Sequence, residues 1–461
     1  MRKPGDTLGT VAIIGAGLAG SEAALVLARN GISVDLFEAR PERMTPAHKT
    51  GYPAELVCSN SFKSNQLPSA HGLLKAELSI LGSPVLEAAK RCAIPGGSAL
   101  VVDREAFSAE VERLIREEPG IRLIRQELKE PPLSYRCCII AAGPLASEDL
   151  TNWLAETFSA SSLHFYDAIA PIVSADSLDM SIVFSASRWE DGEGDYLNCP
   201  FSEEQYRVFY DTLREADRVI ARSFENQKFF EACLPIEVAA QRGYEALAFG
   251  PLRPVGLIDP RTGKRPFAVC QLRREKLSGE SYNLVGFQTR LTIPEQKRVF
   301  RLIPGMEKAE FLRFGSIHRN TYLDSPKLLC EDLSFHSNRS LFLAGQICGS
   351  EGYTESVVTG HLAAAAVVAR VRGETFVVPP AETALGSLLR HVTCSEEKSF
   401  TPSNIHFGLF PPLEEKRKGR GWKKEKKELL CDRGVKGMTD WSLKTGLVRG
   451  SEVKQSQSVP A

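Results

Sequence analysis

The sequence has little of three things: paired cysteines, long apolar runs and net charge. Its eleven cysteines are too sparse for a disulfide scaffold, their number is odd and none form a C-x-x-C, so reduced thiols in a cytoplasmic protein are expected. The longest apolar runs, such as residues 361–371, fall short of the ~20 residues that a membrane span requires. The first ten residues also lack the apolar centre of a signal peptide. We therefore expect a cytoplasmic protein without a membrane partner.

The charge balance limits the classes of partner. The chain has 57 basic and 57 acidic side chains, so a nucleic acid could be attracted only by a local basic surface. The apolar fraction of 43% and the charged fraction of 25% are ordinary for a globular protein. With 461 residues, the chain is longer than one hydrophobic core usually holds, which predicts two or three domains.

Residues 10–40 carry the clearest motif, with the pattern of a strand, a glycine turn, a helix and a second strand. In the turn, Gly15 permits the tight bend, Gly17 lets a pyrophosphate approach the backbone, and Gly20 lets helix and strand pack closely. Glu38 ends the second strand, where an acid suits a ribose 2′-hydroxyl. The segment therefore predicts a dinucleotide site of the Rossmann type; the alternative is a glycine-rich turn with a surface glutamate.

Two later segments decide which dinucleotide is expected. "CIIAAGP" at 138–144 resembles the second turn of two-dinucleotide flavoproteins, and "LFLAGQICGSEGY" at 341–353 resembles the late segment that meets their flavin end. Those proteins usually carry Asp after the glycine, where this chain has Gln346. No second G-x-G-x-x-G occurs, so a nicotinamide reductant would bind without a Rossmann unit of its own. Together the segments favour FAD over NAD.

The order of these segments predicts an α/β fold, a Rossmann-like FAD-binding domain of the two-dinucleotide type with an inserted mixed α+β domain. The insertion is expected where strands, Gly/Pro turns and one helical stretch at 203–233 replace the earlier pattern. A basic run at 416–427 then leads into an end without apolar periodicity. The expected divisions are residues 8–165 and 301–412 for the FAD domain, 166–300 for the insertion, and 413–461 for a frayed basic tail.

Two cysteines stand in unusual surroundings. Cys58 follows an apolar triplet and opens the polar run "SNSFKSNQ", with no cysteine nearby to pair with it. Cys233 lies in "FFEACLPIEVAAQRG", with Glu231, Glu237 and Arg242 close in sequence. A thiol is a good nucleophile only as a thiolate, which requires cationic or dipolar help that the sequence cannot show. The residues alone leave both structural and catalytic roles open, and they give no reason to expect a metal site.

Basic and aromatic residues interleave between 244 and 298, and "HRN" follows at 318–320. Such a surface suits RNA phosphates and unstacked bases. Acidic residues are interspersed, so an ordinary solvated surface is the alternative. The aromatic members are Tyr244, Phe249, Phe267, Tyr282 and Phe287; the basic ones are Arg253, Arg261, Lys264, Arg265, Arg273, Arg274, Arg290, Lys297 and Arg298.

The chain resembles the TrmFO family of folate- and FAD-dependent tRNA (uracil-5-)-methyltransferases. The resemblance covers roughly residues 10–412, through "VAIIGAGLAGSEAA", "AELVCSNSFKS", "FEACLPIEVAAQRG", "HRNTYL", "FLAGQICGSEGYTES" and "TPSNIHFGLFPPL". It implies methylenetetrahydrofolate as carbon donor, FAD reduced by NADPH or NADH, and a T-loop uridine of tRNA as substrate. A thiol would add to C6 of a base flipped from its loop and make C5 nucleophilic. No obligate protein partner is implied.

The resemblance also assigns roles to individual residues. It implies that Cys233 attacks uracil and that Cys58 lies beside the flavin. It places the FAD site at Gly15, Ala16, Gly17, Leu18, Ala19, Gly20 and Glu38, and the flavin-end loop at Gly345, Gln346, Gly349, Gly352 and Tyr353. The end of the chain departs from the family, which normally continues with a helix that "LLCDRGVKGMTDWSLKTG" does not predict.

Three other functions are weighed against this one. A wobble-uridine-modifying flavoprotein would be markedly longer, with an extra C-terminal helical domain. A small-molecule FAD-dependent oxidoreductase with Cys58 as a redox thiol would need a resolving cysteine nearby, and the sequence has none. A flavin-bearing RNA-binding protein without catalysis would need neither Cys58 nor Cys233, and the sequence has both.

Overall fold

The computed structural model describes residues 10–158, 162–189, 194–219, 234–395, 400–414 and 421–446. Two hydrophobic cores occupy this part of the chain. The first is built from the beginning and the end of the chain, and the second from the middle. An α/β flavoprotein-like domain interrupted by an insertion is therefore the observed architecture.

A five-stranded parallel sheet forms the centre of the first core. Four of its five strands have every residue buried, as expected of a parallel sheet that is covered on both faces. In spatial order the strands are β16 (Leu341–Leu343), β7 (Cys137–Ile140), β1 (Val11–Ile14), β2 (Val34–Glu38) and β6 (Ile121–Arg125).

The strand–turn–helix–strand pattern of residues 10–40 is confirmed. Helix α1 (Leu18–Arg29) follows β1, and it ends at Asn30 with Gly31 in the left-handed region at φ +78°. β2 then returns parallel to β1, with Val11 opposite Val34. The βαβ unit places the start of α1 at the carboxyl edge of the sheet, where open α/β folds bind their ligands.

The late segment joins the same sheet, as the sequence predicts. β16 pairs with β7, with Leu341 opposite Cys138, and leads through the short 3₁₀ helix η3 (Gln346–Cys348) into α11 (Tyr353–Arg372). A Cβ at Gly360 would overlap the carbonyl oxygen of Ala19, so glycine is needed where α11 crosses α1 closely. Segments about 330 residues apart therefore form one packed unit.

Further elements complete the first core. The small antiparallel sheet consists of β3 (Ser61–Ser64), β5 (Ala99–Val102) and β4 (Ala93–Ile94). The helices are α2 (Ala70–Ile80), α3 (Pro84–Arg91), α4 (Arg104–Glu117), α5 (Glu148–Phe158), α10 (Ser325–Leu328), α12 (Ala384–Cys394) and α13 (Trp422–Thr445). Asp103 caps α4 by accepting from the amides of Glu105 and Ala106.

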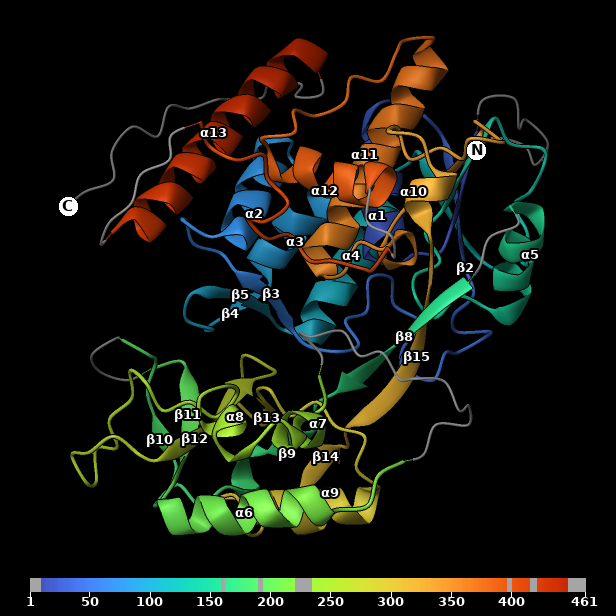
Figure 1. Cartoon of the computed structure of the whole chain (residues 1–461). Coiled ribbons are helices and arrows are strands. Elements are labelled where there is room, and N and C mark those ends of the chain that lie inside the picture. The colour runs from blue at the N-terminus through green and yellow to red at the C-terminus, as the bar shows by residue number, and fades with distance from the viewer. Residues whose placement is uncertain are drawn as a thin grey trace.

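The second core is an antiparallel sheet with short helices. Its strands, in spatial order, are β10 (Phe184–Ser185), β11 (Tyr196–Phe201), β12 (Ala268–Arg274), β13 (Ser281–Leu284), β9 (Ile172–Ser174) and β14 (Phe311–Arg313). Its helices are η1 (Ala175–Ser177), α6 (Glu203–Glu215), α7 (Ile236–Gln241), α8 (Tyr244–Ala248) and α9 (Ile293–Phe300). The antiparallel ribbon of β8 (Ser162–Ile169) and β15 (Ser316–Leu323) runs between the two parts (Figure 1).

The structure corrects two expectations about this middle part. The second core includes buried Met306 and Ala309 and contacts Phe311, so it extends past the expected limit at 300. The helical stretch expected over 203–233 ends at Glu215, because the chain turns away to pair Arg218 with Leu291. Residues 220–233 lie outside the described part of the chain.

The C-terminal end is also corrected. The expectation of a frayed tail from 413 is wrong for residues 422–445, which form the 24-residue helix α13. The helix packs along α2 (Figure 1). Its buried Met438 and Trp441 belong to the first core. No helix among the described residues is long and apolar enough to cross a bilayer.

Candidate functional site

The turn between β1 and α1 has the geometry of a phosphate-binding loop. Gly15 has φ +98°, and a Cβ there would lie 2.6 Å from the carbonyl oxygen of Ala141. A Cβ at Gly20 would overlap the carbonyl oxygen of Gly15. At Gly17 a Cβ would meet no atom within 4 Å. The first and third glycines are therefore required by packing, and the second leaves the backbone open to a ligand.

The start of α1 suits an anion. Gly17 is its N-cap and supplies no side-chain cap, and the first turn contains no acidic residue. The first amides of a helix lack carbonyl partners within the helix, and the helix dipole adds positive potential there. Leu18 and Ala19 lie in this first turn. The turn therefore fits the pyrophosphate of FAD, which its backbone would hold.

Glu38 closes the turn from the end of β2. Its Oε2 accepts from the amide of Ala16 at 2.9 Å, and its Oε1 accepts from Nε of Arg40 at 2.8 Å. Burial would raise the pKa of Glu38, but the hydrogen bonds and charge of Arg40, with the Ala16 amide, outweigh it and leave that pKa below its ordinary value. Glu38 is thus an ionised acceptor beside the turn, as a ribose hydroxyl requires. Arg40 was not among the predicted residues.

The late glycine loop lies against this turn. Gly345, Gly349 and Gly352 have φ values of +84°, +83° and +121°, so each occupies backbone that favours glycine. A Cβ at Gly345 would lie 3.1 Å from Cβ of Ala19. The structure therefore brings the two predicted glycine segments together. Gln346 donates through Nε2 to Oε2 of the buried Glu351 at 2.5 Å, and so shapes the loop internally.

Tyr353 joins this loop to Cys58. The Tyr353 hydroxyl accepts from the amides of Cys58 and Ser59, both at 3.0 Å, and donates to the carbonyl of Ser59 at 2.9 Å. Burial raises the pKa of Tyr353, so its hydroxyl stays protonated and able to donate. The Cys58 thiol is half-buried, with Sγ 3.9 Å from the carbonyl oxygen of Ala168. Cys58 therefore lies at the N-terminal end of α11, beside the flavin-end loop.

Arginines hold the backbone before Cys58. Arg104, at the start of α4, donates to the carbonyl of Leu56 at 2.6 Å. Arg313, in β14 of the second core, donates to the carbonyl of Val57 at 2.7 Å. No sequence signal indicated these contacts, since an arginine that binds a main-chain carbonyl places no demand on the type of its partner.

A third arginine binds the side chains of the two residues after Cys58. Arg273 of β12 donates through Nε to Oδ1 of Asn60 at 2.9 Å and through Nη2 to Oγ of Ser59 at 3.0 Å. Asn60 in turn donates to the carbonyl of Arg274 at 2.8 Å. The polar residues after Cys58 therefore bind protein groups of the second core.

The predicted nucleophile Cys233 lies outside the described residues. The described chain resumes at residue 234, and α7 begins at Ile236. The amide of Ile236 donates to the carbonyl of Gln288 at 2.7 Å, and buried Glu237 accepts from the hydroxyl of Thr289 at 2.9 Å. The segment that follows Cys233 is thus fixed on the second core.

The predicted basic–aromatic surface is only partly present. Tyr282 and Phe287 are buried in the second core, and Tyr244 packs edge-on against the buried Tyr206 at 4.9 Å, so these rings serve packing. Phe249 is 73% exposed and remains available to a ligand. Several of the cations form ion pairs: Arg261 with Asp259, Arg290 with Glu237, and Arg298 with Glu295.

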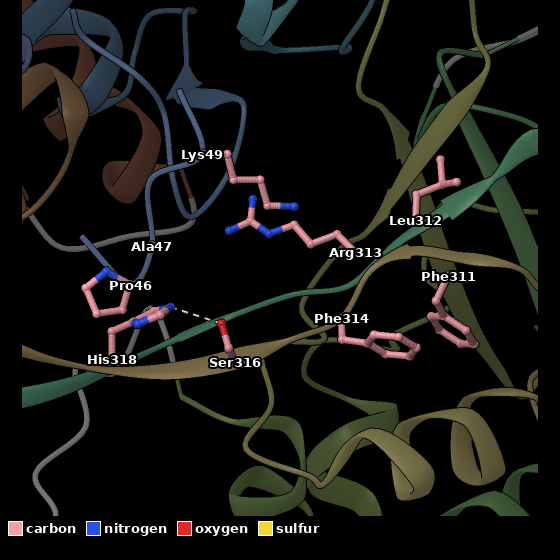
Figure 2. A pocket seen from close by; sticks show the side chains of 9 residues that line it. All are labelled: Pro46, Ala47, Lys49, Phe311, Leu312, Arg313, Phe314, Ser316 and His318. Atoms are coloured by element: carbon pink, nitrogen blue, oxygen red, sulfur yellow. Dashed lines mark hydrogen bonds between the residues drawn. The ribbon is translucent and has the colours of Figure 1, made fainter. Parts of the chain in front are cut away.

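A pocket of about 270 Å³ opens beside the Cys58 loop (Figure 2). It lies between the loop after β2 and the strands β14 and β15. Its lining combines cations, an imidazole and apolar rings: Pro46, Ala47, Lys49, Phe311, Leu312, Arg313, Phe314, Ser316 and His318. Arg313 both lines the pocket and holds the carbonyl before Cys58. The pocket was not predicted from the sequence.

Comparison with known proteins identifies the family. The family model of glucose inhibited division protein A (GIDA) matches residues 10–375. The methylenetetrahydrofolate--tRNA-(uracil-5-)-methyltransferase TrmFO of Heliobacterium modesticaldum is 52% identical over 411 residues, 89% of this chain and 93% of that protein. The protein of the same name from Anaeromyxobacter dehalogenans (strain 2CP-1) is 51% identical over 442 residues, 95% of this chain and 96% of that protein.

A solved structure has the same fold. Aquifex aeolicus GidA superimposes with a TM-score of 0.68 at 16% identity, covering 95% of this chain and 74% of that one. At this identity the likeness concerns the fold alone, and it agrees with the flavoprotein-like architecture described above. With the family model matched over most of its length and relatives about half identical over nearly all of it, the chain belongs to the GIDA family and, within it, to the TrmFO group.

Proposed function

We propose that this protein methylates C5 of the T-loop uridine in tRNA, forming 5-methyluridine. Methylenetetrahydrofolate is the carbon donor, and FAD with NADPH or NADH is the reductant. The observation that carries the proposal is the position of Cys58, which Tyr353 fastens to the flavin-end loop at 3.0 Å. The open turn at Gly17 and the names of the TrmFO relatives support it.

The residues present fit FAD. The first amides of α1 would hold its pyrophosphate, Glu38 its ribose, and the loop from Gly345 to Tyr353 its flavin end. When bound, FAD supplies the carbon-carrier and hydride chemistry that side chains lack. Cys58 is held beside that end by contacts on its own backbone, so its thiol is free to cover the reactive face of the flavin and exclude water.

Cys233 is proposed as the nucleophile. Its thiolate forms a bond to C6 of uracil, and the displaced electron pair makes C5 nucleophilic. C5 then forms a bond to the methylene carbon, and as C5 loses its proton the bond from this carbon to the nitrogen that carried it breaks, leaving the electron pair on that nitrogen. A hydride, with electrons that come from NADPH or NADH, converts the methylene to methyl, and the C6–S bond breaks to return the thiolate. Because C5 and C6 are stacked inside the T-loop, the base must be flipped out first.

A labelling experiment tests this function. The purified FAD-loaded protein is incubated with an unmodified tRNA transcript, NADPH or NADH, and methylenetetrahydrofolate labelled in its methylene carbon. Label in 5-methyluridine is expected. Flavin reduction without label in the tRNA would overturn the proposal and favour a small-molecule oxidoreductase.

A substitution of Cys233 tests its role as the nucleophile. Cys233→Ala should lower label transfer by at least ~10³-fold, because the uridine can no longer be activated, while the FAD absorbance spectrum stays unchanged. Cys394→Ala is the matched control, since Cys394 is exposed and lies at the end of α12, outside the described site. Full activity of Cys233→Ala would remove Cys233 from this role.

A further inference from the structure

A thiol and an imidazole meet away from the site described above. Sγ of Cys330 lies 2.9 Å from Nδ1 of His336. The two residues stand on opposite arms of a tight hairpin, in which the amide of Cys330 donates to the carbonyl of Ser334 at 2.8 Å and the amide of His336 donates to the carbonyl of Leu328 at 2.9 Å. The backbone of the hairpin therefore holds the two side chains together.

This pair is suited to nucleophilic chemistry. A thiol reacts as its thiolate, and an imidazole nitrogen at hydrogen-bond distance can take the thiol proton. Cysteine and histidine also bind metals, but the described ranges contain no group of three or more His, Cys, Asp and Glu side chains that could hold an ion. Cys330 is partly exposed and His336 is exposed, so a small reagent can reach both side chains.

A cavity of about 550 Å³ opens beside Cys330. The hairpin, the last two turns of α11 and the segment after α11 enclose it, and Ala366, Phe376 and Val378 give it an apolar wall. Ala366 lies 13 residues after Tyr353 in α11, which at ~1.5 Å per residue is a separation of roughly 20 Å. The cavity is therefore distinct from the flavin-end loop, and its size is that of a small-molecule site.

Both signs of charge line this cavity. Nη2 of Arg339 lies 2.9 Å from Oδ2 of Asp332, and Nη2 of Arg370 lies 3.5 Å from the same oxygen. Each guanidinium has five N–H donors, so donors remain for the carboxylate of a ligand. The exposed carboxylates of Glu331 and Glu374 also line the cavity and can accept from an ammonium. A zwitterionic ligand therefore matches this lining better than a ligand with one sign of charge.

We propose that Cys330 is a modification site, which forms a mixed disulfide with a small zwitterionic thiol of the chemical class of cysteine and glutathione. The co-reactant is the disulfide of that thiol. The Cys330 thiolate attacks one sulfur of it, the new S–S bond forms as the old one breaks, and the leaving thiolate takes up the proton that His336 received. One disulfide is exchanged for another, so no further oxidant is required.

The exchange is measured on the FAD-loaded protein with oxidised glutathione and with cystine, and peptide mass mapping gives the rate at each cysteine. Cys330 should gain the adduct at least ~10-fold faster than Cys394. Cys394 is the internal reference, because it is exposed and its thiol contacts Thr393 at 3.4 Å and Glu331 at 3.9 Å instead of an imidazole. Equal rates at the two cysteines with both probes would overturn the inference. When Cys330 reacts faster, the faster probe identifies which of the two thiols fits the cavity.

The substitution His336→Gln tests the imidazole. It should slow adduct formation at Cys330 by ~10-fold or more, and it should slow alkylation of Cys330 by iodoacetamide as well, because the thiol has lost its proton acceptor. His406→Gln, at an exposed histidine in a different loop, is the matched control and should change neither rate. Wild-type rates in His336→Gln would show that the imidazole does not activate this thiol.

The substitution Glu374→Gln tests recognition of the zwitterion. It should slow exchange with oxidised glutathione and cystine and leave exchange with the neutral bis(2-hydroxyethyl) disulfide unchanged, because the neutral reagent has no ammonium. Glu130→Gln, at an exposed position that does not line the cavity, should match the wild type with every disulfide. If the wild-type protein reacts with the neutral disulfide as fast as with either zwitterion, Cys330 is a reactive thiol without a ligand site, and the inference fails.

Discussion

Among single residues, the Tyr353 hydroxyl has the clearest measurable role. It satisfies the amides of Cys58 and Ser59 and the carbonyl of Ser59. Tyr353→Phe leaves these three groups without that partner in a buried place, which should lower the free energy of unfolding by about 1–3 kcal/mol. It should also release Cys58 from its position and slow label transfer. Urea unfolding and the transfer assay measure the two effects.

The matched control is Tyr52→Phe, because Tyr52 is 39% exposed and lies in the loop after β2. This variant should match the wild type in both assays. A Tyr353→Phe protein with wild-type stability and transfer rate would show that the hydroxyl does not position the thiol.

The site was predictable where backbone geometry demands one residue type. Glycine at 15, 20 and 345 is forced by positive φ or close approach, so it leaves a readable signal. Arg104 and Arg313 left none, because they donate to main-chain carbonyls that any residue presents; Arg273 binds the side chains of Ser59 and Asn60, which lie far from it in sequence. Their convergence on the Cys58 loop depends on how two cores pack, which the local pattern does not encode.

Helix α13 shows why the sequence predicted a frayed tail where the chain forms a helix. The buried positions of α13 follow helical spacing: Leu430, Cys431, Gly434, Met438, Trp441 and Ser442. Because a glycine, a cysteine and a serine are among them, the apolar pattern is weak. Glycine is also a poor helix former. The helix is stabilised by tertiary contacts, such as the hydrogen bond of 3.0 Å from the Trp441 indole to the carbonyl of Val377.

Gly434 lies where α13 packs closely against α2. A Cβ there would lie 2.9 Å from a methyl of Leu73 and 3.0 Å from Oε1 of the buried Glu77. Gly434→Leu gains ~1 kcal/mol of helix propensity but overfills a contact at a cost of about 1–3 kcal/mol. We expect a net loss of stability and faster proteolysis within α13. Lys436→Leu, at an exposed position of the same helix, should be at least as resistant as wild type.

At the scale of the whole molecule, a few specific contacts join the two cores. Besides the β8–β15 ribbon, Arg104 of the first core binds Glu275 of the second through two contacts of 2.5 and 3.1 Å. Burial would lower the pKa of Arg104, but the charge of Glu275 outweighs it and raises that pKa. Because Arg104 also holds the carbonyl of Leu56, this ion pair links the position of the second core to the Cys58 loop.

Breaking this pair should therefore loosen the loop as well as the junction. Glu275→Gln leaves a largely buried guanidinium without its counter-charge, which should destabilise the fold by roughly 3–5 kcal/mol and speed hydrogen exchange at residues 56–60. The double variant Arg104→Met/Glu275→Gln should recover part of that stability, since the unpaired charge of Arg104 is removed as well. Yet its loop should still exchange faster than wild type, because Leu56 has lost its donor. Wild-type exchange in both variants would mean that the cores are coupled only through the ribbon.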